Sequence, residues 1–251
     1  MQRTPFFIWL LRVVSVVLHV LLGICIATFV LPFASKQTRL SITNWWSSVL
    51  LNCFNIKIIT HGSLPDKQTQ STMFVANHIS WTDIHALNSI VPVRFIAKIE
   101  IKSWPIFGYL VSKSGTLFIN RSIRKDAARI VDITTESLKE QDNVCLFPEG
   151  TTTDGTQTLP FKSSIIQAAI EAKATIWPVA IYYPLPDGKP NINMAFAGET
   201  SMLESMKLIL RMRSPVAKLY FLTPIPCDNH TRQSVTKLAY DAIISQLNTQ
   251  H

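Results

Sequence analysis

The chain has 251 residues, enough for one well-buried domain and a small appendage. Apolar residues make up 47% of it and charged residues only 16%, while the formal net charge is +8. This composition excludes a disordered basic tail, and the scattered cations do not form the dense basic stripe of a nucleic-acid-binding module. The basic excess therefore indicates contact with anionic lipid headgroups or with phosphate-bearing substrates, and we expect no nucleic-acid partner.

Residues 1–54 are predicted to anchor the protein to a membrane. Residues 13–33 form an apolar run of 21 residues that would span about 30 Å as a helix, the thickness of a bilayer core. The run is longer than that of a secretory signal peptide and lacks a clear cleavage site, so we interpret it as an uncleaved anchor. Basic residues flank it on both sides, so counting them does not fix its orientation. Arg12 and His19 also permit a helix that lies in the membrane interface.

A second helix is predicted at residues 40–54. Its paired tryptophans, Trp45 and Trp46, are typical of the headgroup boundary, but an ordinary core helix explains the same pattern equally well. With the first segment it would form a helical hairpin that seats residues 55–251 on the membrane. We expect an inner or cytoplasmic membrane, with the catalytic domain on the cytoplasmic side.

Residues 55–251 are predicted to form an α/β domain, a mixed and mostly parallel sheet flanked by helices. Short apolar runs rich in β-branched residues predict strands at 56–60, 72–76, 94–97, 116–120, 144–147, 175–182, 193–197 and 217–222. Helical patterns lie between them at 82–89, 125–139, 163–172, 202–212 and 232–247. Ser201 with Glu204 gives the fourth helix a capping-box start.

The stretch 77–83 places His78 and Asp83 five positions apart, directly after an apolar run. Residues that face each other on one helix are three or four apart, so we expect His78 in a loop and Asp83 in the first turn of the following helix. Ser80 fits as the N-cap of that helix, with Asp83 completing a capping box. A carboxylate on one imidazole nitrogen fixes the tautomer and leaves the other nitrogen to take a proton. Taken alone, an ordinary capping aspartate and a loop histidine explain the same stretch.

Three further stretches of the α/β region stand out. Residues 115–121 deliver Arg121 at the end of a strand, where its planar fork suits a phosphate or a carboxylate. Residues 147–155 follow a buried-looking strand with a proline, Glu149, two glycines and a run of hydroxyls, a loop that brings backbone N–H groups close to a ligand. Pro178 interrupts an apolar strand, which predicts a sheet edge or a bulge beside the site.

Together these stretches resemble the four sequence blocks of the glycerolipid acyltransferase family, the lysophosphatidic acid acyltransferases and their relatives. Residues 77–83 match its Asn-His-(x)4-Asp block, and residues 115–121 match Gly-x-x-Phe-Ile-x-Arg. Residues 147–151 match Phe-Pro-Glu-Gly-Thr, and Pro178 matches the proline of the last block. The stretch 95–98 and the Trp-Pro pair that follows it are also similar to the family. The resemblance covers roughly residues 55–225, and its first and third blocks in this order and spacing are specific.

The resemblance implies transfer of an acyl group from a thioester, acyl-CoA or acyl carrier protein, to the free hydroxyl of a lysolipid in a membrane. His78 would be the general base and Asp83 would orient it. The acceptor would be held by Asn77, Lys98, Arg121, Glu149, Gly150, Thr151 and Thr152. The chain holds no Gly-x-Ser-x-Gly elbow, so direct transfer without an acyl-enzyme is expected. Cysteines 25, 53, 145 and 227 are not spaced for zinc, and we expect neither a metal nor a cofactor.

One position departs from the family pattern. Members that accept lysophosphatidic acid commonly have arginine after Phe-Pro-Glu-Gly-Thr, whereas this chain has Thr152 and resembles members that acylate lyso-ornithine lipid. The expected acceptor is 1-acyl-sn-glycerol-3-phosphate, with lyso-ornithine lipid the close alternative. Two other classes stay open, a lipid hydrolase in which water replaces the acceptor and a non-catalytic lipid-binding protein.

Overall fold

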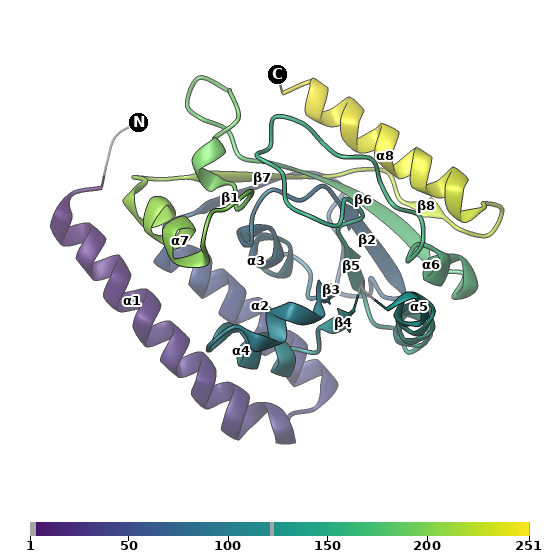
Figure 1. The fold of residues 1–251 in the computed structure, drawn as a ribbon, viewed down its shortest axis with the longest axis horizontal. Coiled ribbons are helices and arrows are strands. Elements are labelled where there is room, and N and C mark those ends of the chain that lie inside the picture. The colour runs from purple at the N-terminus through teal and green to yellow at the C-terminus, as the bar shows by residue number, and fades with distance from the viewer. Residues whose placement is uncertain (1–3, 121–122, 251) are drawn as a thin grey trace.

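A computed structural model describes residues 4–120 and 123–250, and in it an eight-stranded sheet carries helices on both faces (Figure 1). The strands are β1 Lys57–Gly62, β2 Thr72–Ala76, β3 Arg94–Lys98, β4 Leu117–Ile119, β5 Val144–Leu146, β6 Thr175–Tyr182, β7 Val216–Phe221 and β8 Ile225–Pro226. The helices are α1 Phe6–Cys25, α2 Lys36–Cys53, α3 Thr82–Asn88, α4 Phe107–Lys113, α5 Arg124–Lys139, α6 Gln167–Glu171, α7 Met202–Arg211 and α8 Arg232–Asn248.

The sheet is mixed and mostly parallel, as predicted. Its order is β1-β7-β6-β2-β5-β3-β4, with β8 also paired to β6. The pairs of β6 with β7 and with β8 are antiparallel and the other pairs are parallel. The central strand β2 is buried along its whole length, because helices cover both of its faces.

Alternate residues of the central strands enter two hydrophobic cores. Phe74 and Ala76 point into a core shared with α1, α2, α3 and α7. Met73 and Val75 point the other way, into a core shared with α5, α6 and α8. This alternation follows from the two-residue period of a strand, and it makes the domain a sheet between two helical layers.

The N-terminal helices form the predicted hairpin. Helix α1 continues as a π-helical segment Ile26–Val30 and a 3₁₀ turn Leu31–Phe33, and Phe6–Phe33 is long and apolar enough to cross a membrane. Only 22% of its most apolar stretch is buried, which is unlike the core helix of a soluble protein. Helix α2 lies beside α1 and buries Leu50 and Leu51 in the domain core, so the core interpretation holds for that face, while Trp45 is 45% exposed.

Hydrogen bonds attach α1 to the domain along its length. The Arg12 guanidinium donates to the carbonyl oxygens of Met212 at 2.7 Å and Arg213 at 2.9 Å, just beyond the last turn of α7. His19 Nε2 lies 3.0 Å from the carbonyl oxygen of Trp46 on α2. Thr28, in the π-helical segment, is hydrogen-bonded to the Tyr109 hydroxyl of α4 at 2.8 Å. The predicted boundary at residue 54 therefore lies between the N-terminal helices and the α/β domain, and both contribute side chains to one hydrophobic core.

Some predicted elements were wrong. The predicted strand 193–197 is a 3₁₀ turn, Ile192–Met194, followed by an irregular segment. The physical reason is that the Phe196 N–H donates to the carbonyl oxygen of Ile79, in the loop after β2, and not to a neighbouring strand. Helix α6 is shorter than predicted, and neither α4 nor the 3₁₀ segment Ile99–Ser103 was predicted.

Pro178 does not lie on an edge strand, because β6 has neighbours on both sides. On one side Pro178 pairs with Val75 of β2. On the other side the pairing with β8 ends at Ile176 and the pairing with β7 begins at Val179. The missing N–H of the proline therefore falls where β6 exchanges one antiparallel partner for another, which explains how a central strand accommodates it.

Candidate active site

The predicted site residues gather at one edge of the sheet. Strands β2, β5 and β3 are parallel neighbours, so their carboxyl ends lie at the same edge. His78 follows β2, Glu149 follows β5, and Lys98 ends β3 with its side chain exposed. Arg121, predicted at the end of the next strand, lies outside the described residues.

His78 and Asp83 form the predicted pair. His78 Nδ1 lies 2.8 Å from Asp83 Oδ2, with His78 in the loop and Asp83 in the first turn of α3. An ionised carboxylate only accepts hydrogen bonds, so Nδ1 carries the proton and Nε2 is left to accept one. The imidazole stacks on Phe147 with ring centroids 3.9 Å apart, and its side chain is 18% exposed. The ring is thus fixed by a charge on one edge and an aromatic face on one side, while part of it stays open to a substrate.

The carboxylate of Asp83 is 0% exposed and takes several hydrogen bonds. Oδ2 also accepts from the backbone N–H groups of Ile79 at 2.7 Å and Ser80 at 2.9 Å. The predicted capping box forms only in part, because Trp81 occupies the N-cap position and the Asp83 N–H donates to the Ser80 carbonyl oxygen, not to its hydroxyl. The loop is drawn in towards the carboxylate, and this curvature brings His78 within reach despite the five-residue gap.

The Glu149 carboxylate accepts hydrogen bonds from two backbone segments, one of which contains His78. Oε1 accepts from the His78 N–H and Oε2 from the Leu159 N–H, both at 2.7 Å. The side chain is 3% exposed, and burial raises the pKa of Glu149 to about 7 against the opposing effect of these two donors. Gly150 follows with φ of 77°, a conformation that favours glycine, and Thr153 N donates to the His78 carbonyl oxygen at 2.9 Å. The loop after β5 therefore holds His78 through its backbone.

Comparisons with known proteins identify the family. The family model described as Acyltransferase matches residues 57–182, which include His78, Asp83 and Glu149. The chain belongs to the acyltransferase family. It is 34% identical to a lyso-ornithine lipid O-acyltransferase of Pseudomonas aeruginosa, over 93% of this chain and 91% of that protein. It is 38% identical to a 1-acyl-sn-glycerol-3-phosphate acyltransferase of Neisseria gonorrhoeae, over 60% of this chain and 58% of that protein.

The fold also has a counterpart among solved structures. The 1-acyl-sn-glycerophosphate acyltransferase of Thermotoga maritima superimposes with a TM-score of 0.70 over 97% of this chain and 95% of that one, at 13% identity. The likeness at that identity concerns the fold, which is that of an acyltransferase.

Three of the predicted binding residues of this acyltransferase have their polar side-chain atoms engaged within the protein, and Glu149, described above, is one of them. The Asn77 amide donates to the Ile181 carbonyl oxygen at 2.9 Å and accepts from the Ile181 N–H at 2.8 Å, extending the ladder between β2 and β6. The Thr152 hydroxyl donates to the carbonyl oxygen of Phe196. Thr151 is exposed at the loop surface. Their contact with substrate stays a prediction.

One residue of the site was not predicted. Tyr183 follows β6, the parallel neighbour of β2, and its hydroxyl lies 2.6 Å from Asp83 Oδ1. The sequence contained one indication of Tyr183, a pair of tyrosines at the end of an apolar strand. The hydroxyl of a buried tyrosine needs a hydrogen-bond partner. That signal gives no indication of which partner.

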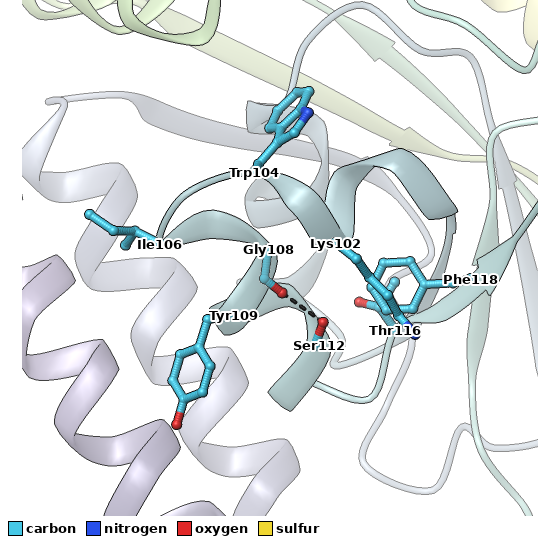
Figure 2. Close-up of a pocket in the computed structure, with 8 residues that line it drawn as sticks. All are labelled: Lys102, Trp104, Ile106, Gly108, Tyr109, Ser112, Thr116 and Phe118. Carbon is cyan, nitrogen blue, oxygen red and sulfur yellow. Dashed lines mark hydrogen bonds between the residues drawn. The ribbon is translucent and has the colours of Figure 1, made fainter.

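A hollow of about 590 Å³ is lined by residues of α4, of the segment before it and of the strand β4 region. Its lining residues, drawn in Figure 2, are Lys102, Trp104, Ile106, Gly108, Tyr109, Ser112, Thr116 and Phe118. In Figure 2 the side chains of Trp104 and Tyr109 point away from each other. The Trp104 ring contacts the ring of Phe196, whose N–H donates to the Ile79 carbonyl oxygen in the loop after β2. The Tyr109 hydroxyl is hydrogen-bonded to Thr28 of the π-helical segment that continues α1. Two wall residues of the hollow are therefore connected to neighbouring elements, Trp104 through Phe196 to the loop after β2 and Tyr109 to the continuation of α1.

Proposed function

We propose that this acyltransferase is a membrane-bound lysolipid O-acyltransferase that uses His78 as its general base. The observation that carries the proposal is the 2.8 Å contact of His78 Nδ1 with the buried Asp83 carboxylate. It supports a base because it leaves Nε2 as the proton acceptor and provides a negative charge to stabilise the imidazolium once the proton has moved.

In the proposed reaction the lysolipid hydroxyl attacks the carbonyl carbon of an acyl thioester while Nε2 of His78 takes its proton. The new ester C–O bond forms and the C–S bond breaks, and the imidazolium returns the proton to the departing thiolate. Asp83 holds the ring in one tautomer and orientation through both protonation states. Acyl-CoA and acyl carrier protein both present such a thioester, and either meets the chemistry of the site.

The arrangement of α1 and the hollow supports a lipid acceptor. The outer face of α1 exposes large apolar side chains, among them Phe7, Leu11 and Leu18, each at least 60% exposed. Such a face suits a membrane surface, because the apolar side chains then leave water. The wall of the hollow is connected to the continuation of that helix through Tyr109 and to the loop after β2 through Trp104 and Phe196, so we propose that an acyl chain in the membrane reaches the site along it.

The loop after β5 favours a zwitterionic acceptor over a phosphate monoester. By the family resemblance, Thr152 stands where members that accept lysophosphatidic acid commonly have arginine, and the charged residue of the segment 150–156 is the exposed Asp154. A carboxylate repels a phosphate monoester and attracts an ammonium. The ornithine headgroup of lyso-ornithine lipid carries both an ammonium and a carboxylate. The relative named for that acceptor also matches over nearly the whole chain, so we propose lyso-ornithine lipid as the first acceptor.

A specific observation also supports 1-acyl-sn-glycerol-3-phosphate, the acceptor that the family resemblance favoured. Lys98 is exposed at the catalytic edge, and Arg121 follows the adjacent strand in sequence. These cations suit a phosphate monoester. The relatives named for this acceptor share the central part of the chain.

An acceptor screen of the purified full chain in lipid vesicles tests both proposals. Labelled acyl-CoA and acyl carrier protein are supplied in turn with lyso-ornithine lipid, lysophosphatidic acid or lysophosphatidylcholine. We expect acyl transfer to lyso-ornithine lipid at the highest rate. Replacing His78 by alanine should lower kcat by about 10²- to 10⁴-fold, the usual loss for a general base.

The exposed His61, on β1, gives the matched control, because His61→Ala removes an imidazole from outside the site. Release of fatty acid at the same rate with and without a lysolipid would favour the hydrolase. Lipid binding without turnover of any acceptor would favour a non-catalytic protein. Full activity of His78→Ala would contradict the assignment of the base.

A further inference from the structure

Tyr183 contacts the catalytic carboxylate from the side opposite His78. Its hydroxyl lies 2.6 Å from Asp83 Oδ1, whereas His78 binds Oδ2. The side chain is 2% exposed and that of Asp83 is 0% exposed. Each oxygen of the carboxylate is therefore occupied by a different side chain, one from the loop after β2 and one from the end of β6.

The direction of these hydrogen bonds follows from their chemistry. An ionised carboxylate cannot donate, so the Tyr183 O–H donates to Asp83. The Tyr183 oxygen also lies 2.7 Å from Thr82 Oγ1, and since its own proton is committed, Thr82 donates to it. The result is a chain in which Thr82 donates to Tyr183, Tyr183 to Asp83, and His78 to the other oxygen of the same carboxylate.

From this geometry we infer that Tyr183 is a positioning residue that fixes the Asp83 carboxylate and, through it, the orientation and basicity of His78. The inference rests on the proposed role of His78 as the base. Without the tyrosine hydroxyl, Oδ1 would lose a donor in a buried site, so more negative charge would be available to His78. The imidazolium would then be stabilised further, and the carboxylate would lose one of the contacts that fix its rotation.

The surroundings of Asp83 decide how this should be measured. The other titratable groups that face it are Glu149, from the loop after β5, and Cys145, on β5. Burial raises the pKa of the Cys145 thiol well above its ordinary value, so it stays neutral. Burial raises the pKa of Glu149 to about 7, so Glu149 titrates in the same range as a histidine. A pH–rate profile alone would mix the two, and the pKa of His78 itself must be followed by NMR.

The experiment compares Tyr183→Phe with Tyr182→Phe in the full chain. The two tyrosines are adjacent, each is 2% exposed, and each donates one hydrogen bond at 2.6 Å. Tyr182, however, lies in a different core and donates to the Gly188 carbonyl oxygen. The two variants therefore remove the same chemical group from two different hydrophobic cores. The histidine signals are followed over pH in ¹³C- and ¹⁵N-labelled protein, and His78→Ala assigns the His78 signal.

For Tyr183→Phe we expect the His78 pKa to rise by about half a unit, because the carboxylate beside it carries more charge. We expect kcat to fall about tenfold while KM for both substrates stays within about twofold, since Tyr183 does not touch substrate. Tyr182→Phe should leave both the His78 pKa and kcat unchanged. Thr82→Val removes the donor to Tyr183 but keeps the tyrosine on Asp83, and it should give a smaller change in the same direction.

An unchanged His78 pKa in Tyr183→Phe, or equal losses in the two tyrosine variants, would overturn the inference. If Tyr183→Phe does not fold, Thr82→Val decides, because no change in its His78 pKa would also overturn the inference. The NMR readout needs no turnover. An inactive wild-type protein whose His78 pKa still moves in Tyr183→Phe would therefore count against the proposed acyl transfer and not against the role of Tyr183.

Discussion

At the scale of residues, backbone N–H groups that meet buried carboxylates build much of the site. Asp83 accepts from the N–H groups of Ile79 and Ser80, and Glu149 accepts from those of His78 and Leu159. Each carboxylate thereby replaces part of its lost hydration and holds a loop that has no regular secondary structure. The two carboxylates hold His78 in different ways, since one contacts its ring and the other its backbone.

Glu149 gives the folded protein a pH dependence that a substitution can isolate. Its pKa is raised from 4.5 to about 7, so folding takes up a proton between these values. The stabilising contribution is complete below pH 4.5 and is lost as pH rises through 7, a change on the order of 3 kcal/mol. We expect the Tm of the wild type, measured against that of Glu149→Gln, to fall between pH 5 and pH 8.

The absolute stability of Glu149→Gln should be lower, since the amide offers only one acceptor oxygen to the two N–H donors. The exposed Glu199 provides the control, and Glu199→Gln should follow the wild type at every pH. A constant difference in Tm between wild type and Glu149→Gln across this range would show that Glu149 does not titrate there.

At the scale of elements, the N-terminal helix is attached to the domain by polar groups as well as by its apolar face. Arg12 satisfies carbonyl oxygens at the end of α7, which a helix otherwise leaves without intrahelical partners. Thr28 and Tyr109 join the π-helical segment to the wall of the hollow. Helix α1 is therefore positioned relative to the site, and its place is set by α7 at one end and α4 at the other.

Substitution of Arg12 tests this attachment. Arg12→Met keeps much of the length and apolar stem of the side chain but removes its donors from the end of α7. We expect a loss of about 2 kcal/mol in the free energy of unfolding, typical of hydrogen bonds from a charged group, measured by thermal unfolding in detergent. Arg39→Met is the matched control, since Arg39 donates to the Ala34 carbonyl oxygen at the exposed start of α2, and its loss should be small. Equal losses would mean that the contact of Arg12 with α7 adds no stability.

At the scale of the whole molecule, the attachment of α1 bears on the geometry of the proposed membrane contact. Thr4 and Arg12 bind the end of α7, His19 binds α2 and Thr28 binds α4. A helix that crossed the bilayer would carry these neighbours with it, including the polar start of α2, at a high cost in hydrocarbon. The outer face of α1 can instead lie on one leaflet with the domain beside it.

This arrangement predicts that both chain ends lie on the same side of the membrane. In vesicles of known orientation that contain the full chain, protease should remove an N-terminal tag and a C-terminal tag from the same side. Detergent-opened vesicles, in which both tags are cut, provide the control. Cleavage of the two tags from opposite sides would show that α1 crosses the membrane.

The sequence by itself determined the α/β class, most of the strands and the pairing of His78 with Asp83. These rest on local information. The period of the apolar residues identifies each helix or strand, and a loop that leads into a helix accounts for the five-residue spacing of His78 and Asp83. Only the tertiary structure decided what depends on contacts distant in sequence. Tyr183 meets Asp83 across 100 positions, Phe196 pairs with Ile79 and not with a strand, and Pro178 fits a central strand because two partners meet there. No local sequence pattern encodes such contacts, because the order of the strands in the sheet determines which strand ends become neighbours.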